Sequence, residues 1–312
     1  MTAITAKMVS ELRELTGAGM MDCKKALVAC DGDTEKAIDF LREKGLAAAA
    51  KKAGRIAAEG LVGVATTEDA SSAVIIEVNS ETDFVAANPE FQALVAASAK
   101  AALNNDVADV EALLATDCGE GTVSELLTAK IAKIGENMTV RRFAKFADAG
   151  CVCAHYIHGN GKVGVVVELE TEATIDEVKE CGRSLAMQVA SMSPKFVDES
   201  AVDAEWKEKE LHILLQQALN ENAELEKPKP EAIVEKMVNG RLAKQLKEVC
   251  LLQQVYVKDG EMTVAQYVAK TAKEIGKEIK VKAFVRYEVG EGIEKKQSNL
   301  AEEVAALTGG AK

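Results

Sequence analysis

The sequence predicts an α+β protein, and three observations lead to that fold class. Apolar residues recur at helical spacing near the N-terminus and again in residues 200–249. Short β-branched runs such as residues 73–78 alternate with helical stretches between those regions. The spacing of Ile-Gly, Val and Phe in residues 134–143 recurs in residues 275–284, which favours two related halves. We expect each half to be a small antiparallel sheet covered on one face by helices.

The chain divides into five predicted parts. In chain order they are a helical docking bundle (1–54), a first core subdomain (55–148), a second core subdomain in two pieces (149–199 and 250–290), an inserted coiled-coil hairpin (200–249) and a C-terminal module (291–312).

Three short helices with tight turns account for the N-terminal bundle, which is similar to ubiquitin-associated-type docking modules. Thr5 can cap the first helix and Thr34 the third, which we expect to end near Gly45 before a helical linker. Met20 and Met21 stand at the turn between the first two helices, where they either fill the core or form an adaptable contact surface. The apolar stripe of the first helix comprises Met8, Val9, Leu12 and Leu15.

The first core half begins with a β-hairpin whose second strand, residues 73–78, ends at turn-favouring residues. Thr82 and Asp83 then form the N-cap region of a helix that we expect to run past Pro89 to about Lys100. The remaining elements of this half are a strand at 61–65, helices at 110–115 and 123–133, and a strand at 138–144.

Phe84 lies at the strand-to-helix corner that this prediction creates. An aromatic ring there can enter an apolar slot on a partner and gain roughly 1.5–3 kcal/mol from full burial. The alternative is that Phe84 packs under its own helix, and physics alone favours this because most aromatic residues belong to the core.

The second core half repeats the order of the first around a hairpin turn at Asn160-Gly161. Its predicted elements are strands at 151–157, 163–169 and 281–287, with helices at 175–192, capped by Thr174, and at 264–275. Two further helices, 201–226 and 233–249, are separated by prolines and carry apolar residues at coiled-coil spacing. This inserted hairpin is either a prop or a surface for a partner, which could be a second copy of the chain or another protein.

Composition excludes several classes of function. The net charge of −12 disfavours direct contact with nucleic acid, whose phosphates require Lys and Arg. Aromatic residues make up only 4% of the chain, which argues against a pocket for a flat cofactor, and we expect no cofactor. Seven irregularly spaced cysteines fit free thiols in a reducing compartment. With no export signal and no apolar run of about 18 residues, we expect a cytoplasmic protein without membrane contact.

No constellation of residues indicates covalent chemistry or a metal site. Residues 159–162 match only the Gly-Lys pair of a phosphate-binding loop. Tyr156 stands where that motif needs its first Gly, and Val163 stands where it needs Ser or Thr. The three histidines show no metal-ligand spacing with cysteine. A thiol enzyme using Cys23 or Cys151 is the enzymatic alternative, although neither has a visible histidine partner in the sequence.

Four motifs together resemble the elongation factor Ts family of guanine-nucleotide exchange factors for elongation factor Tu. They are residues 12–27, residues 77–85 with Thr82-Asp83-Phe84-Val85 at their end, residues 134–137 and residues 156–159. The resemblance implies that the chain binds elongation factor Tu with GDP, wedges its G domain, dislodges magnesium and so lets GTP replace GDP. It implies no covalent chemistry. A helical adaptor that binds a partner without exchange activity remains the main alternative.

The same resemblance implies roles for individual residues. Thr82, Asp83, Phe84 and Val85 are implied in magnesium dislocation, and Arg13, Met20, Met21, Lys24, Ile134, Gly135, Glu136, Asn137 and His158 in partner binding. His158-Gly159 is separated from the following Val163-Gly164 by one residue more than the family pattern has. The family also implies that the inserted hairpin supports a homodimer in some members, and that the C-terminal module with its last helix at 300–307 rests on elongation factor Tu.

Overall fold

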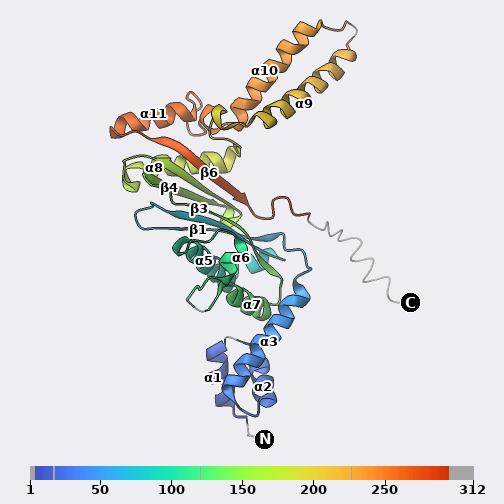
Figure 1. The fold of residues 1–312 in the computed structure, drawn as a ribbon, viewed down its shortest axis with the longest axis vertical. Coiled ribbons are helices and arrows are strands. Elements are labelled where there is room, and N and C mark those ends of the chain that lie inside the picture. Colours follow the sequence, from blue (N-terminus) through green and yellow to red (C-terminus); the bar gives the residue numbers. More distant parts are fainter. Residues whose placement is uncertain (1–3, 17, 120, 226, 295–312) are drawn as a thin grey trace, which may run out of the picture.

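The computed structural model describes residues 4–16, 18–119, 121–225 and 227–294, and it is elongated (Figure 1). The N-terminal helices lie at one end, two sheets with their helices form the middle, and a helical hairpin projects at the other end. Each sheet is three-stranded and antiparallel, so the predicted α+β class is confirmed. The helix predicted at 300–307 and most of the predicted C-terminal module lie outside the described residues.

The N-terminal bundle consists of α1 (Ala6–Thr16), α2 (Met20–Ala29) and α3 (Thr34–Lys52). Leu12, Cys23 and Leu27 are fully buried between these helices. Thr5 Oγ1 accepts the Met8 N–H at 3.2 Å, as its predicted role in capping requires.

Two predictions for the third helix are wrong. Its N-cap is Asp33 rather than Thr34, and the Asp33 carboxylate accepts a backbone N–H of the first turn at 3.1 Å. The helix does not end near Gly45 but continues to Lys52, so it includes much of the predicted linker. Gly45 is buried where α3 crosses α7 (Val123–Ile134), and side chains of α7 lie 3.7 Å from where a Cβ would stand. A Cβ at that distance would make ordinary van der Waals contact with α7, so Gly45 is an interior residue of α3 that packs against α7 and does not end the helix.

The first sheet has the strand order β1-β2-β3, formed by β1 (Glu59–Thr66), β2 (Ala73–Ser80) and β3 (Met138–Phe146). Its outer face is covered by α5 (Pro89–Asn104) and α7, and α6 (Val110–Ala115) packs beside them. Ile76 of β2 and Phe91 and Leu94 of α5 are fully buried in this layer.

The helix predicted to run from Thr82 to about Lys100 is two helices. The short α4 (Asp83–Ala86) ends before Asn88, and α5 begins at Pro89. Asn88 Oδ1 accepts the Glu90 N–H at 2.9 Å and so caps α5. Pro89 occupies the first helical position, where its missing N–H costs nothing, whereas inside one continuous helix it would break a hydrogen bond.

The second sheet has the order β4-β5-β6, formed by β4 (Cys151–His158), β5 (Val163–Glu170) and β6 (Lys280–Glu288). Its outer face carries α8 (Ile175–Met192) and α11 (Val264–Ile275). Short 3-10 turns lie at η1 (Gly159–Gly161), η2 (Glu199–Ala201) and η3 (Leu251–Gln253). The halves correspond as the repeated spacing predicted, because Gly135 and Gly276 end α7 and α11 with φ of 91° and 75°.

The two sheets pack face to face, which the sequence analysis did not predict. Val62 and Ile75 of the first sheet and Cys153 and Val166 of the second belong to one buried cluster. Consequently β2 is covered on both faces, and all eight of its residues are buried. The resulting order of layers is helices, sheet, sheet, helices (Figure 1).

One glutamate at the same place in each half is buried between the sheets. Glu77 and Glu168 both precede a register shift in the central strand, and both are at most 2% exposed. Burial alone raises the pKa of Glu77, but the Gly290 N–H at 2.8 Å and the neighbouring Arg142 at 2.6 Å bring it below its usual value. Arg142 lies opposite Glu77 in the first sheet, whereas the residue opposite Glu168 in the second sheet is Ala283. Burial of the Glu168 carboxyl raises its pKa.

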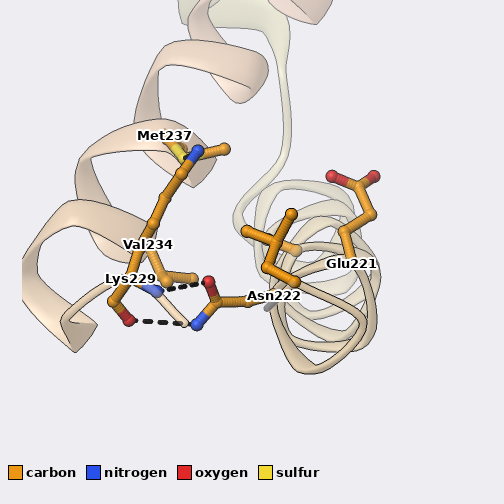
Figure 2. A pocket seen from close by; sticks show the side chains of 7 residues that line it. Glu221, Asn222, Lys229, Val234 and Met237 are labelled. Atoms are coloured by element: carbon orange, nitrogen blue, oxygen red, sulfur yellow. Dashed lines mark hydrogen bonds between the residues drawn. The ribbon is translucent and has the colours of Figure 1, made fainter. Parts of the chain in front are cut away.

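The inserted hairpin consists of α9 (Ala204–Ala223) and α10 (Glu231–Val249). The first helix is shorter at both ends than the predicted 201–226, and the second begins two residues before the predicted start at 233. Part of the predicted apolar seam is satisfied within the hairpin, because Ala218, Val234 and Val238 are buried between its two helices. At the tip, Asn222 exchanges two hydrogen bonds of 2.7 and 3.0 Å with the Lys229 backbone beside a cavity of about 120 Å³ (Figure 2). The proposed homodimer through this hairpin stays a prediction.

Candidate protein-binding site

Phe84 points into solvent from the corner between β2 and α4. The strand ends at Ser80, Thr82 takes the N-cap position, and Phe84 in the first turn of α4 is 84% exposed. Val85 is 5% exposed and packs into the first core. The alternative in which Phe84 packs under its own helix is therefore wrong. Asp83 and Phe84 form the outer side of the corner, and Val85 fixes its inner side.

Two carboxylates join this corner to the turn that follows α7. Glu136 accepts the Thr82 N–H at 3.0 Å and the Thr82 hydroxyl at 2.8 Å. In return, Glu81 accepts the Asn137 N–H at 2.6 Å. We call this pair of reciprocal contacts, made by residues 81, 82, 136 and 137, the carboxylate clasp. It brings together the two segments that the sequence analysis marked separately as residues 82–85 and 134–137.

The segment between α3 and β1 is attached to the same clasp. Asn137 Nδ2 donates to the Arg55 carbonyl at 2.8 Å, and the Arg55 guanidinium lies 3.4 Å from Glu81. Asn137 is 6% exposed, so its side chain is used within the protein. Ile56, which follows Arg55 in the chain, is 45% exposed and adds an apolar side chain to this segment.

His158 stands on the hairpin tip of the second half, exposed, with its Nδ1 2.9 Å from the Tyr156 hydroxyl. The tip reaches the first sheet through Lys162, whose ammonium lies 2.5 Å from Glu59. Glu59 pairs with Ser80 in the first sheet, so the His158 loop and the Phe84 corner lie toward the same end of that sheet.

The N-terminal bundle presents a further exposed surface. Met20 and Met21 are 58% and 64% exposed, and Arg13 of α1 and Lys24 of α2 are exposed as well. The alternative in which these methionines fill the core is therefore wrong. Leu15, predicted on the buried stripe of the first helix, is in fact 68% exposed and belongs to the outer surface. Helical periodicity placed Leu15 on the same face as Leu12, but Leu15 lies in the last turn of α1 and its side chain is not covered.

A family model described as elongation factor TS matches residues 81–291 of this sequence. The chain belongs to the elongation factor Ts family. Elongation factor Ts of Clostridioides difficile (strain 630) is 56% identical over 306 residues, which are 98% of this chain and 99% of that protein. Elongation factor Ts of Clostridium tetani (strain Massachusetts / E88) is 54% identical over 304 residues, covering 96% and 98% of the two chains. The protein is accordingly a translation elongation factor.

The second half of the protein carries exposed apolar side chains that the sequence analysis missed. Met192, Val255 and Val257 are each 47–57% exposed. Gln188 holds the backbone of the two valines, because its side chain bonds Val255 at 3.1 Å and Val257 at 2.9 Å, and Met192 lies one turn further along α8. A loop with no periodicity offers no sequence signal for such a surface.

The two thiols considered for an enzyme, Cys23 and Cys151, lie in the protein interior. Burial raises the pKa of the Cys151 thiol, which disfavours the reactive thiolate. Within the described parts of the chain, no group of three His, Cys, Asp or Glu side chains is arranged to hold a metal ion. None of the helices that can be described is long and apolar enough to cross a membrane.

Proposed function

We propose that this chain binds elongation factor Tu in its GDP-bound form and promotes GDP release, so that GTP can bind. The observation that carries the proposal is the exposed Phe84 on a corner whose neighbours are fixed on both sides. Leaving a large aromatic ring in water sacrifices roughly 1.5–3 kcal/mol that full burial against a partner recovers. An aromatic anchor entering a pocket is the usual centre of a protein interface.

The N-terminal bundle serves as the anchor in this proposal. Met20 and Met21 supply flexible apolar contacts that adapt to a partner helix. Arg13 and Lys24 are basic residues on a chain of net charge −12, so they favour docking to an acidic patch on the partner. The net charge as a whole disfavours a direct role for nucleic acid, and we place the activity in the cytoplasm.

Phe84 and Asp83 act as the wedge. The ring enters an apolar slot of the G domain, and the exposed Asp83 carboxylate comes near the magnesium that bridges nucleotide and protein. Mg²⁺ demands nearly ideal octahedral geometry, so a small displacement of its ligands weakens its binding sharply. Without the metal the phosphate-binding loop holds GDP less tightly. No covalent bond is made or broken in this exchange.

Ile134, Gly135 and His158 extend the contact on either side of the wedge. Gly135 is exposed, and a Cβ there would meet nothing within 4 Å, which leaves its backbone open to a partner. The exposed His158 presents Nε2 while the Tyr156 hydroxyl engages Nδ1. Thr82 and Val85 support the corner from inside the protein.

The test is release of a fluorescent GDP analogue from elongation factor Tu, measured with excess unlabelled GDP at rising concentrations of this protein. We expect the release rate to rise with concentration and then saturate. Binding without acceleration would contradict the proposal and favour a helical adaptor. Repeating the titration with the metal chelated separates insertion of the Phe84 ring from displacement of magnesium. The acceleration of GDP release by this protein should be smaller when magnesium is already absent.

A further inference from the structure

The carboxylate clasp joins two segments that lie far apart in the chain. Its bonds connect residues 54 and 56 positions apart, from the corner after β2 to the turn after α7. Both carboxylates take part: Glu136 binds residue 82 through two hydrogen bonds, and Glu81 binds residue 137 through one. Charge-assisted bonds of this kind are about twice as strong as neutral ones, and a pair of them fixes orientation as well as distance.

Apart from the clasp, one side-chain hydrogen bond fixes the backbone before Phe84, because the Ser80 hydroxyl donates to the Thr82 carbonyl at 3.0 Å. The helix that carries it has four residues, and its N-cap Thr82 makes no side-chain capping bond, because the hydroxyl donates to Glu136 instead. The ring itself, 84% exposed, is not held by packing. Val85 and Ala86 secure the inner side of α4, whereas the clasp secures its start, two residues before Phe84.

The clasp also lies on the path from the wedge to the anchor. The turn holding Glu136 ends α7, and α7 packs against α3 at the buried Gly45. The α3 helix is continuous from the N-terminal bundle to Lys52. The exposed methionines and Phe84 are therefore placed relative to one another through α3, α7 and the clasp.

We propose that Glu136 and Glu81 are positioning residues, which hold Phe84 so that docking of the bundle delivers the ring into its slot. The inference rests on the proposed function and deepens it. It also changes the expectation for Glu136 and Asn137, whose polar groups were expected to contact the partner but are engaged within the protein. Preorganisation of this kind improves the step at which the ring inserts more than it improves the initial docking.

The structure supplies both a conservative variant and a matched control. Glu136→Ala removes both bonds to Thr82, whereas Glu136→Gln keeps an oxygen for the Thr82 N–H and an NH₂ that can donate to the hydroxyl. Glu125 has the same bonding pattern at the opposite end of α7, since it accepts the N–H and hydroxyl of Thr122 at 2.9 and 3.4 Å. Glu125→Ala thus removes equivalent bonds from the same helix without touching the corner.

GDP release at rising concentrations of each variant separates positioning from contact. For Glu136→Ala we expect the maximal rate to fall about tenfold or more, since a misplacement of about 1 Å can cost on the order of 100-fold. The half-saturating concentration should change much less, Glu136→Gln should keep most of the rate, and Glu125→Ala should match the parent. A raised half-saturating concentration with an intact maximal rate, or an equal loss in Glu136→Gln, would show that Glu136 contacts the partner and overturn the inference.

A second readout does not depend on exchange. Phe84→Trp in a Trp206→Phe background places the only tryptophan at the corner, and Trp206 lies on the distant hairpin helix α9. Time-resolved anisotropy of the free protein then reports local motion of residue 84. We expect Glu136→Ala to increase that motion and Glu125→Ala to leave it unchanged. Unchanged motion in Glu136→Ala would refute the positioning role, even if the parent protein proved not to catalyse exchange.

Discussion

Replacing Phe84 with alanine separates binding from folding, and the structure sets the size of both effects. The side chain is 84% exposed, so its loss should change the free energy of unfolding by no more than about 0.5 kcal/mol. Phe91, seven positions along the chain, is fully buried under the same sheet. Phe91→Ala should cost about 3–5 kcal/mol and serves as the matched control for the same chemical change.

The effect of Phe84→Ala on exchange follows from the area that the ring still has to bury. Full burial of such a side chain is worth about 1.5–3 kcal/mol, and 84% of it remains available in the free protein. The loss is then about 1.3–2.5 kcal/mol, or about 10- to 70-fold in the rate of GDP release at low concentration of this protein.

Two measurements test this prediction together. Urea denaturation gives the free energy of unfolding, and fluorescent GDP release from elongation factor Tu gives the exchange rate. A variant that unfolds as readily as Phe91→Ala would mean that Phe84 supports the core. A variant that is stable and exchanges nucleotide at the parent rate would refute the wedge.

Three further variants test other parts of the mechanism and of the core. Met20→Ala combined with Met21→Ala should raise the half-saturating concentration in GDP release more than it lowers the maximal rate, because both side chains belong to the anchor. Asp83→Asn should reduce the acceleration at millimolar magnesium more than in chelator, and an equal loss in both conditions would exclude a role through the metal. Burial raises the pKa of Glu168 above its value in the unfolded chain, so its stabilising contribution is present at low pH and is lost as pH rises through the folded-state pKa. Glu168→Gln should therefore flatten the dependence of unfolding free energy on pH above the ordinary glutamate range, and an unchanged slope in urea denaturation would contradict this.

Local sequence signals were sufficient for most elements of the core. The β-branched run at 73–78 predicted β2, and the repeated Ile-Gly spacing predicted the paired ends of α7 and α11 at Gly135 and Gly276. The break before Pro89 was missed, although Asn88-Pro89 combines a capping side chain with a proline suited to the first helical position. Gly45 misled the prediction, since a glycine inside a helix looks the same in sequence as one that ends a helix.

The direction of side chains at the candidate site could not be derived from local pattern. Phe84 and Val85 are adjacent apolar residues, and only the position of α4 against the sheet decides that Val85 is buried while Phe84 is exposed. The clasp depends on residues 54 and 56 positions apart, a separation at which a single sequence gives no contact information. Resemblance to a family named both segments but did not indicate that they are bonded to each other.

The central claim, that this protein and GDP compete for elongation factor Tu, is tested most directly by a reciprocal titration. Affinity of this protein for elongation factor Tu is measured by calorimetry with and without saturating GDP, and GDP affinity is measured with and without this protein. Linkage requires the two ratios to be equal, and a coupling of at least about 1–3 kcal/mol predicts that GDP weakens the complex by about fivefold to 150-fold or more. An affinity that GDP leaves unchanged would contradict the account.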